Sequence, residues 1–251
     1  MGRSGDRIGP TPRPHHVRRF DRTERALHWI HATAFFALLG TGLALWLPQL
    51  SVWVGRRALV KEIHLWTAVA WAVAVVLVII LGDRRALRAA WREIEAIDRD
   101  DRRWLLGRRR PQGRFNAGQK LNAIVTTAFA LLFAASGVLL WLSARDSRFR
   151  WEGPIVVHDT LTLLSVAVLL GHLYLAVVHP TTRHALRGMT LGDVREDWAR
   201  RHHAKWMEAN ETHGLPSADS AIDVPARRDA ETPRRARLAR LTRESRGDRG
   251  A

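Results

Sequence analysis

The chain has 251 residues, 47% of them hydrophobic, and 40 Lys and Arg against 24 Asp and Glu give a formal net charge of +16. Cysteine is absent, which excludes disulfide bonds, thiolate metal sites, iron–sulfur ligation and haem attached through a Cys-x-x-Cys-His motif. The basic residues flank long apolar segments, so the positive charge indicates a lipid surface as partner rather than nucleic acid.

The first 18 residues form a polar, Arg-rich tail, and no apolar core or cleavage site of a signal peptide is evident in residues 1–25. Four apolar segments follow, each long enough to cross a hydrocarbon layer of about 30 Å. They are residues 26–47, 64–82, 121–143 and 154–178. A soluble four-helix bundle is the alternative, but its helices would carry charged residues on an outer face. Apart from Asp159, these segments contain no Asp, Glu, Lys or Arg.

The basic residues are unevenly distributed among the connecting segments. Segment 1–25 carries seven Arg and segment 83–120 carries twelve Lys or Arg, whereas segments 48–63 and 144–153 carry three each. The positive-inside rule therefore predicts that both termini and the long connection 83–120 are cytoplasmic. Several tryptophans lie near the opposite, outer ends, as in an aromatic belt: Trp46, Trp53, Trp141 and Trp151.

The long connection contains the segment "RRALRAAWREIEAI", in which Leu87, Trp91, Ile94 and Ile97 share one helical face. This pattern predicts an amphipathic helix on the inner membrane surface. Residues 208–251 are charged and rich in Pro and Ala, which predicts a disordered cytoplasmic tail. No internal repeat stands out. The predicted fold is an all-α, integral membrane four-helix bundle that occupies residues 19–207.

Histidines lie near both ends of the predicted spans. With the direction given above, His64 and His158 lie near the outer ends, and His28 and His172 near the inner ends. The fourteen residues from His158 to His172 rise about 21 Å along a helix and make nearly four turns, so both side chains project from one face. Ionisable residues inside a membrane are costly and normally face a partner, a cavity or a cofactor.

Two haem groups, each held by two neutral imidazoles, fit this arrangement of four histidines in two levels. A single membrane histidine is more often a hydrogen-bonded structural residue, but four in two matched levels are harder to explain separately. His31 and His179 are competing ligands, but both are expected to lie near the interface as polar or propionate-facing groups. Asp159 is either unremarkable or orients His158 by accepting a hydrogen bond from its second ring nitrogen.

The sequence resembles the cytochrome b (gamma) subunit of membrane-bound respiratory formate dehydrogenase. The matching segments run in order from about residue 19 to residue 207. They are "RALHWI" around His28, "KEIHLW" around His64, "FNAGQK" at 115–120, "HDTLTLLSVAVLLGHLYLA" from His158, and "GMTLGDVREDWARRHHAKW" at 188–206. The resemblance implies two b haems, one held by His64 with His158 and the other by His28 with His172, in agreement with the depth analysis.

The resemblance also implies a quinone site near the inner haem, for menaquinone or ubiquinone, with Asn116, Gly118 and His172 taking part. A structural alternative is that Asn116 caps the third span and Gly118 only permits close packing. Gln119 and Lys120 are expected to anchor the helix at the membrane interface.

The resemblance implies a location in the bacterial plasma (inner) membrane. The implied partners are an iron–sulfur (beta) subunit and a molybdenum- or tungsten-pterin catalytic (alpha) subunit, which would oxidise formate in place of this chain. A homo-oligomeric complex is left open. Two other functions remain as alternatives. One is a dihaem cytochrome b that serves a hydrogenase or another respiratory oxidoreductase. The other is a His-lined transporter for a transition metal, although the spans contain no carboxylate apart from Asp159 and no Met-rich segment.

Overall fold

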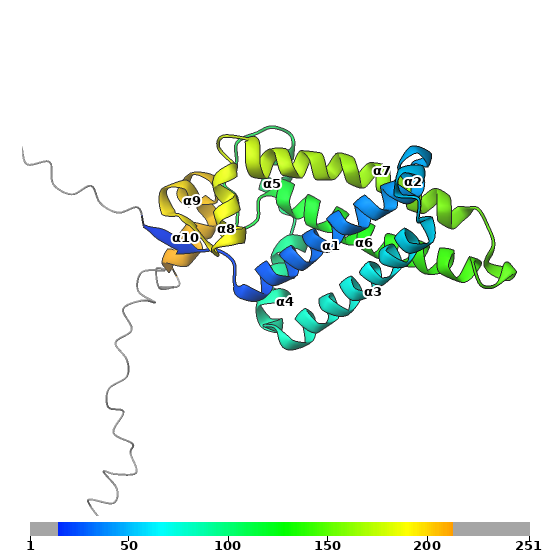
Figure 1. The fold of residues 1–251 in the computed structure, drawn as a ribbon. Coiled ribbons are helices and arrows are strands. Elements are labelled where there is room, and N and C mark those ends of the chain that lie inside the picture. The colour runs from blue at the N-terminus through cyan, green and yellow to red at the C-terminus, as the bar shows by residue number, and fades with distance from the viewer. Residues whose placement is uncertain (1–14, 213–251) are drawn as a thin grey trace, which may run out of the picture. The chain divides into compact units, whose positions relative to one another are not determined.

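The computed structural model describes residues 15–212 (Figure 1). Within this range four helices are long and apolar enough to cross a membrane. They are α1 (Arg22–Trp46), α3 (Arg57–Leu81), α6 (Ala117–Ser143) and α7 (Gly153–Leu173), which the π-helical turn η2 (Tyr174–Val178) extends. The predicted all-α membrane bundle is confirmed.

The spans expose large apolar side chains, which decides between a membrane bundle and a soluble one. Trp66, Leu131 and Leu170 are each more than 60% exposed. In water such surfaces would have to be buried against other protein, whereas lipid tails solvate them. The chain is a multi-pass membrane protein.

The four spans form two antiparallel pairs, α1 with α3 and α6 with α7 (Figure 1). Polar residues ahead of the apolar segments set where two of these helices begin. Asp21 forms a capping box with Glu24 at the start of α1, and Asn116 forms one with Gln119 at the start of α6. The second span starts at Arg57, before the predicted residue 64, because charged residues can extend a helix beyond its membrane segment.

Two short helices lie at one end of the bundle, which we call the loop end. They are α2 (Pro48–Val54), between α1 and α3, and the 3-10 turn η1 (Ser147–Phe149), between α6 and α7. All four tryptophans of the predicted aromatic belt lie at this end and are exposed: Trp46, Trp53, Trp141 and Trp151. The position of these side chains is the one expected at a membrane–water interface.

The remaining elements gather at the opposite end, which we call the capped end (Figure 1). They are α4 (Arg84–Glu95), α5 (Arg99–Leu105), η3 (Arg183–Ala185), α8 (Leu186–Thr190), α9 (Glu196–His202), α10 (Ala204–Thr212) and an antiparallel pair of strands, β1 (His16–Arg18) with β2 (Asp193–Arg195). Their hydrophobic core contains Val194, Trp198, Ala199 and Met207.

His203 is a buried polar residue in this region and is 1% exposed. Burial, together with the nearby Arg19 guanidinium, lowers its pKa to about 3. The ring is therefore neutral, and its Nδ1–H donates to the Gly113 carbonyl at 2.7 Å. This bond ties α9 and α10 to the segment that precedes α6.

The predicted amphipathic helix exists as α4, but it ends at Glu95, before Ile97. Ile94 is buried, whereas Trp91 is 44% exposed. One part of the apolar face therefore packs on protein, chiefly α6, and another part is left open.

Lys120 is not an interfacial anchor, in contrast to the expectation from sequence. Its ammonium group is buried and donates to Asp101 Oδ2 at 2.7 Å and to the Ala96 carbonyl at 2.8 Å. Gln119 also has a structural role, because its side-chain oxygen accepts from the Asn116 N–H and from Arg19. The two residues hold α5 and β1 to the start of α6.

The predicted tails lie mostly outside the described residues, since residues 1–14 and 213–251 are not described. The predicted N-terminal tail, 1–18, includes β1, and the boundary predicted at residue 207 falls within α10.

Candidate functional site

Two pairs of histidines from different helices face each other, and of the four side chains three are half-buried and that of His172 is exposed. His64 of α3 lies opposite His158 of α7, with ring centroids 6.3 Å apart and planes at 65°. His28 of α1 lies opposite His172 of α7, also at 6.3 Å, with planes at 54°. The first pair is nearer the loop end and the second nearer the capped end. The structure thus brings together the same pairs as the depth analysis.

The separation within each pair suits two axial ligands of one iron. A metal–nitrogen bond of about 2 Å on each side, plus the distance from Nε2 to each ring centre, places two ring centroids roughly 6 Å apart. Neutral imidazole is a haem ligand, and in this chain no thiolate competes with it. The donor set and its spacing therefore fit haem. Among residues 15–212 there is no cluster of three or more His, Asp or Glu side chains that could form a different metal site.

The two competing histidines have other surroundings. His31 lies against the rings of Trp71, at 5.7 Å, and Phe35, at 6.4 Å. His179 follows η2, and its Nδ1 is within hydrogen-bond distance of the hydroxyls of Thr181 and Thr182. Neither of them is paired with a second imidazole in the described part of the chain.

Two hydroxyl groups contact the histidines of the pair near the loop end. Thr41 Oγ1 of α1 lies 2.8 Å from His64 Nδ1, and Ser136 Oγ of α6 lies 2.9 Å from His158 Nδ1. Ser136 therefore occupies the ring nitrogen for which Asp159 was a candidate. Neither Thr41 nor Ser136 was among the site residues predicted from the sequence.

A short internal repeat could have revealed them. The segments "TGLALWL" at 41–47 and "SGVLLWL" at 136–142 share a hydroxyl residue, a glycine and a Leu-Trp-Leu ending. Each lies on the first helix of a span pair. The sequence therefore contains one short internal repeat, although none was expected to matter.

Asn116 and Gly118, predicted at a quinone site, both have structural roles. Asn116 Oδ1 accepts from the Gln119 N–H at 2.9 Å, which caps α6. A Cβ added at Gly118 would lie 3.4 Å from the Trp104 ring, so the glycine permits close packing there. These contacts match the structural alternative.

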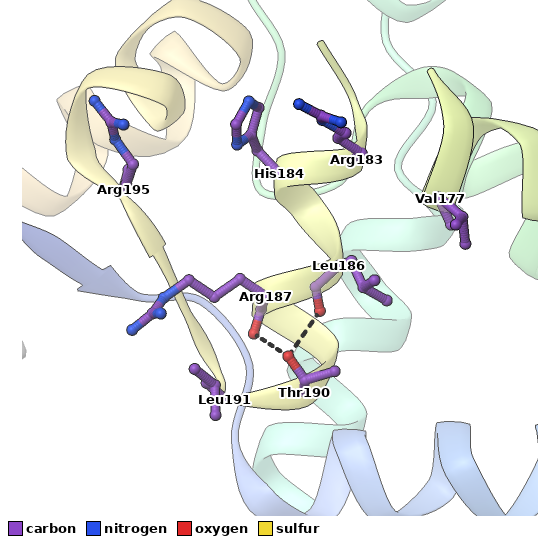
Figure 2. A pocket seen from close by; sticks show the side chains of 9 residues that line it. Val177, Arg183, His184, Leu186, Arg187, Thr190, Leu191 and Arg195 are labelled. Atoms are coloured by element: carbon purple, nitrogen blue, oxygen red, sulfur yellow. Dashed lines mark hydrogen bonds between the residues drawn. The ribbon is translucent and has the colours of Figure 1, made fainter. Parts of the chain in front are cut away.

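A pocket of about 490 Å³ lies at the capped end, just beyond the last span (Figure 2). One part of its wall is apolar, with Val177, Leu186 and Leu191, and another is basic. Figure 2 shows Arg187 and Arg195 on this wall, and both make ion pairs, with Asp193 and Asp197 respectively. None of the predicted site residues lines this pocket.

The capped-end pair is nevertheless close to the pocket along the chain. The wall residue Ala176 follows His172 by one helical turn, within the π-helical turn η2. Single π-helical turns are frequent at functional sites. Trp29, the neighbour of His28, donates from Nε1 to the carbonyl of Met189 in α8 at 2.9 Å.

Comparison with known proteins identifies the family. The family model described as prokaryotic cytochrome b561 matches residues 19–192. This range includes both histidine pairs and the segment that begins at Asn116.

Several curated relatives are formate dehydrogenase subunits. The cytochrome b556(Fdn) subunit of the nitrate-inducible formate dehydrogenase of Escherichia coli K12 is 25% identical over 198 residues, which covers 73% of this chain and 86% of that protein. The cytochrome b556(fdo) subunit of the same strain is 25% identical over 207 residues, with 75% and 90% covered. The cytochrome b556 subunit of Haemophilus influenzae formate dehydrogenase is 22% identical, with 72% and 78% covered. The resemblance found in the sequence is confirmed.

Proposed function

The chain belongs to the prokaryotic cytochrome b561 family, whose members are membrane electron-transfer proteins with b haem, and we propose that it carries electrons across the membrane through two b haems. His64 and His158 would hold one haem, and His28 and His172 the other. The observation that carries this proposal is that two separate histidine pairs have the same 6.3 Å ring separation.

Each haem, when bound, supplies a one-electron carrier. The contribution of the chain is to hold four imidazoles in two pairs on three helices, α1, α3 and α7. His158 and His172 project from one helix at levels about 21 Å apart, so α7 supplies a ligand at each level. This arrangement suits stepwise transfer from one side of the membrane to the other.

We propose that the capped end is cytoplasmic and the loop end is outside. The support is the distribution of basic residues, twelve in connection 83–120 against three in each of the segments 48–63 and 144–153. Reporter domains fused to the two termini should both be active in the cytoplasm. An external C-terminal reporter would reverse the assignment of inner and outer haem.

We further propose a quinone site near the inner, capped-end pair, formed with Asn116, Gly118 and His172. The quinone, menaquinone or ubiquinone, would take its protons from the cytoplasm, so that turnover contributes to a transmembrane potential. Support comes from the resemblance and from the position of Asn116 at the start of α6, which lies at the capped end.

The proposed donor complex is a formate dehydrogenase. The relatives named above are subunits of such enzymes, and the match covers most of their length. An iron–sulfur subunit would deliver electrons at the loop end. A molybdenum- or tungsten-pterin subunit would oxidise formate in place of this chain.

Formate should reduce the haems in membranes that contain the intact complex, and added quinone should reoxidise them. Both changes should be visible in the haem absorption bands. The measurement is the difference absorption spectrum, with membranes lacking this chain as the control. Reduction by hydrogen but not by formate would support the alternative, a hydrogenase cytochrome. Membranes that accumulate a transition metal through this chain without any haem band would support the transporter.

A further inference from the structure

We infer that Thr41 and Ser136 are positioning residues for the loop-end haem, because each accepts the Nδ1–H of one of its two axial histidines and leaves Nε2 for the iron. The inference rests on the proposed function, since it assigns a role toward a haem held by His64 and His158. It adds the residues that orient those ligands.

The hydrogen-bond partners of the two hydroxyls determine which atom donates. Thr41 Oγ1 lies 2.8 Å from the Ala37 carbonyl in its own helix, and a carbonyl can only accept. The single hydroxyl hydrogen is therefore used there, and toward His64 Nδ1, at 2.8 Å, the oxygen must accept. Nδ1 of His64 thus carries the proton in a neutral ring, and Nε2 has the free lone pair.

The same logic holds for the second hydroxyl. Ser136 Oγ donates to the Leu132 carbonyl at 2.7 Å and lies 2.9 Å from His158 Nδ1. Ser136 is itself buried, 3% exposed, so water does not replace it easily. His158 is consequently held in the same tautomer as His64.

A glycine follows each hydroxyl residue and faces the same ring. A Cβ added at Gly42 would lie 3.5 Å from Cε1 of His64, and one added at Gly137 would lie 3.8 Å from Cε1 of His158. Each glycine therefore faces the ring across a space in which an added Cβ would make an ordinary van der Waals contact. A hydroxyl residue followed by a glycine thus lies beside one histidine in each span pair, at the start of the shared sequence [ST]-G-x-x-L-W-L.

The capped-end pair lacks such hydroxyl contacts in the described part of the chain. Within residues 15–212, no side-chain hydroxyl is hydrogen-bonded to a ring nitrogen of His28 or His172, and the aromatic neighbour of His28 is the Trp29 ring at 5.4 Å. A hydrogen bond from Nδ1–H raises the basicity of a metal-bound imidazole and so favours oxidised over reduced iron. The two hydroxyls should therefore lower the potential of the loop-end haem selectively, which favours onward transfer to the capped end.

The test is a redox titration of the purified haem-loaded protein, followed by absorption and by electron paramagnetic resonance of the ferric haems. The variants are Thr41→Val and Ser136→Ala, which remove the hydroxyls. The conservative variants Thr41→Ser and Ser136→Thr keep a hydroxyl at each position. Thr127→Val is the control, because Thr127 Oγ1 donates to the Ala123 carbonyl of its own helix and is hydrogen-bonded to no histidine among residues 15–212.

We expect Thr41→Val and Ser136→Ala each to raise the potential of one haem and to alter its ferric signal, while the other haem and the Thr127→Val protein keep wild-type values. Loss of the loop-end haem alone in Thr41→Val, with a normal haem content in Thr41→Ser, supports the same role.

Unchanged potentials in a protein with two haems would overturn the positioning role and leave the proposed function intact. Loss of the loop-end haem in Thr41→Val that Thr41→Ser does not restore would assign Thr41 a packing role instead. A wild-type protein without haem would overturn both proposals.

Discussion

Replacement of His172 by alanine should remove the haem of the capped-end pair and abolish quinone reduction, while the other haem remains. His64 and His158 lie on the loop-end side, about 21 Å away along α7, and contact neither His172 nor His28. Electrons from the donor complex should therefore still reduce the loop-end haem. The measurement combines the donor-reduced absorption spectrum with the rate of quinone reduction in membranes.

A contrasting variant separates loss of the haem from loss of the quinone site. Asn116→Ala should keep both haems, and both should be reducible, but quinone turnover should fall. If Asn116→Ala leaves the rate near that of the wild type and only lowers thermal stability, Asn116 acts as a helix cap alone, as its bond to the Gln119 N–H would suggest. If the His172→Ala protein keeps two haems, His31 or His179 supplies a ligand, and the inner pair is wrongly assigned.

Replacement of Lys120 by alanine should cause a large loss of stability. Asp101 is 3% exposed, and Lys120 Nζ is 2.7 Å from its carboxylate. Removal of one partner of a buried ion pair typically costs about 3–5 kcal/mol, because a charge is left buried without compensation. The Ala96 carbonyl would lose its donor as well. The connection formed by α4 and α5 should then detach from α6 at a lower temperature.

The matched control is Lys205→Ala. Lys205 also bridges to this connection, through Asp98 at 2.7 Å and Asp100 at 2.6 Å, but its side chain is 35% exposed. Exposed pairs contribute roughly 0–1 kcal/mol, so the midpoint of thermal unfolding should hardly change. The double variant Lys120→Met with Asp101→Leu should recover much of the loss. Equal shifts for Lys120→Ala and Lys205→Ala would show that burial of the first pair does not matter.

The spans and the histidine pairs could be predicted from sequence because both depend on local rules. Apolar length identifies a span, and the helical rise gives the depth of each histidine along it. His158 and His172 illustrate this, since a spacing of fourteen residues alone puts them on one face. The partner of each then follows from depth, because His28 and His64 lie near opposite ends of their spans.

Contacts between elements distant in sequence could not be predicted in this way. Lys120 reads as an interfacial lysine until α5 places Asp101 against it. The strand pair β1–β2 joins residues 16–18 to residues 193–195, and nothing in either short segment specifies the other. The roles of Thr41 and Ser136 depend on which face of one helix meets the histidine of the next.

The haem content of the purified chain tests the central claim most directly. The pyridine haemochrome spectrum gives the amount of protohaem, and amino-acid analysis gives the amount of protein. Two paired sets of neutral imidazoles predict two low-spin protohaems per chain. A ratio of one or zero in fully loaded protein would contradict the account.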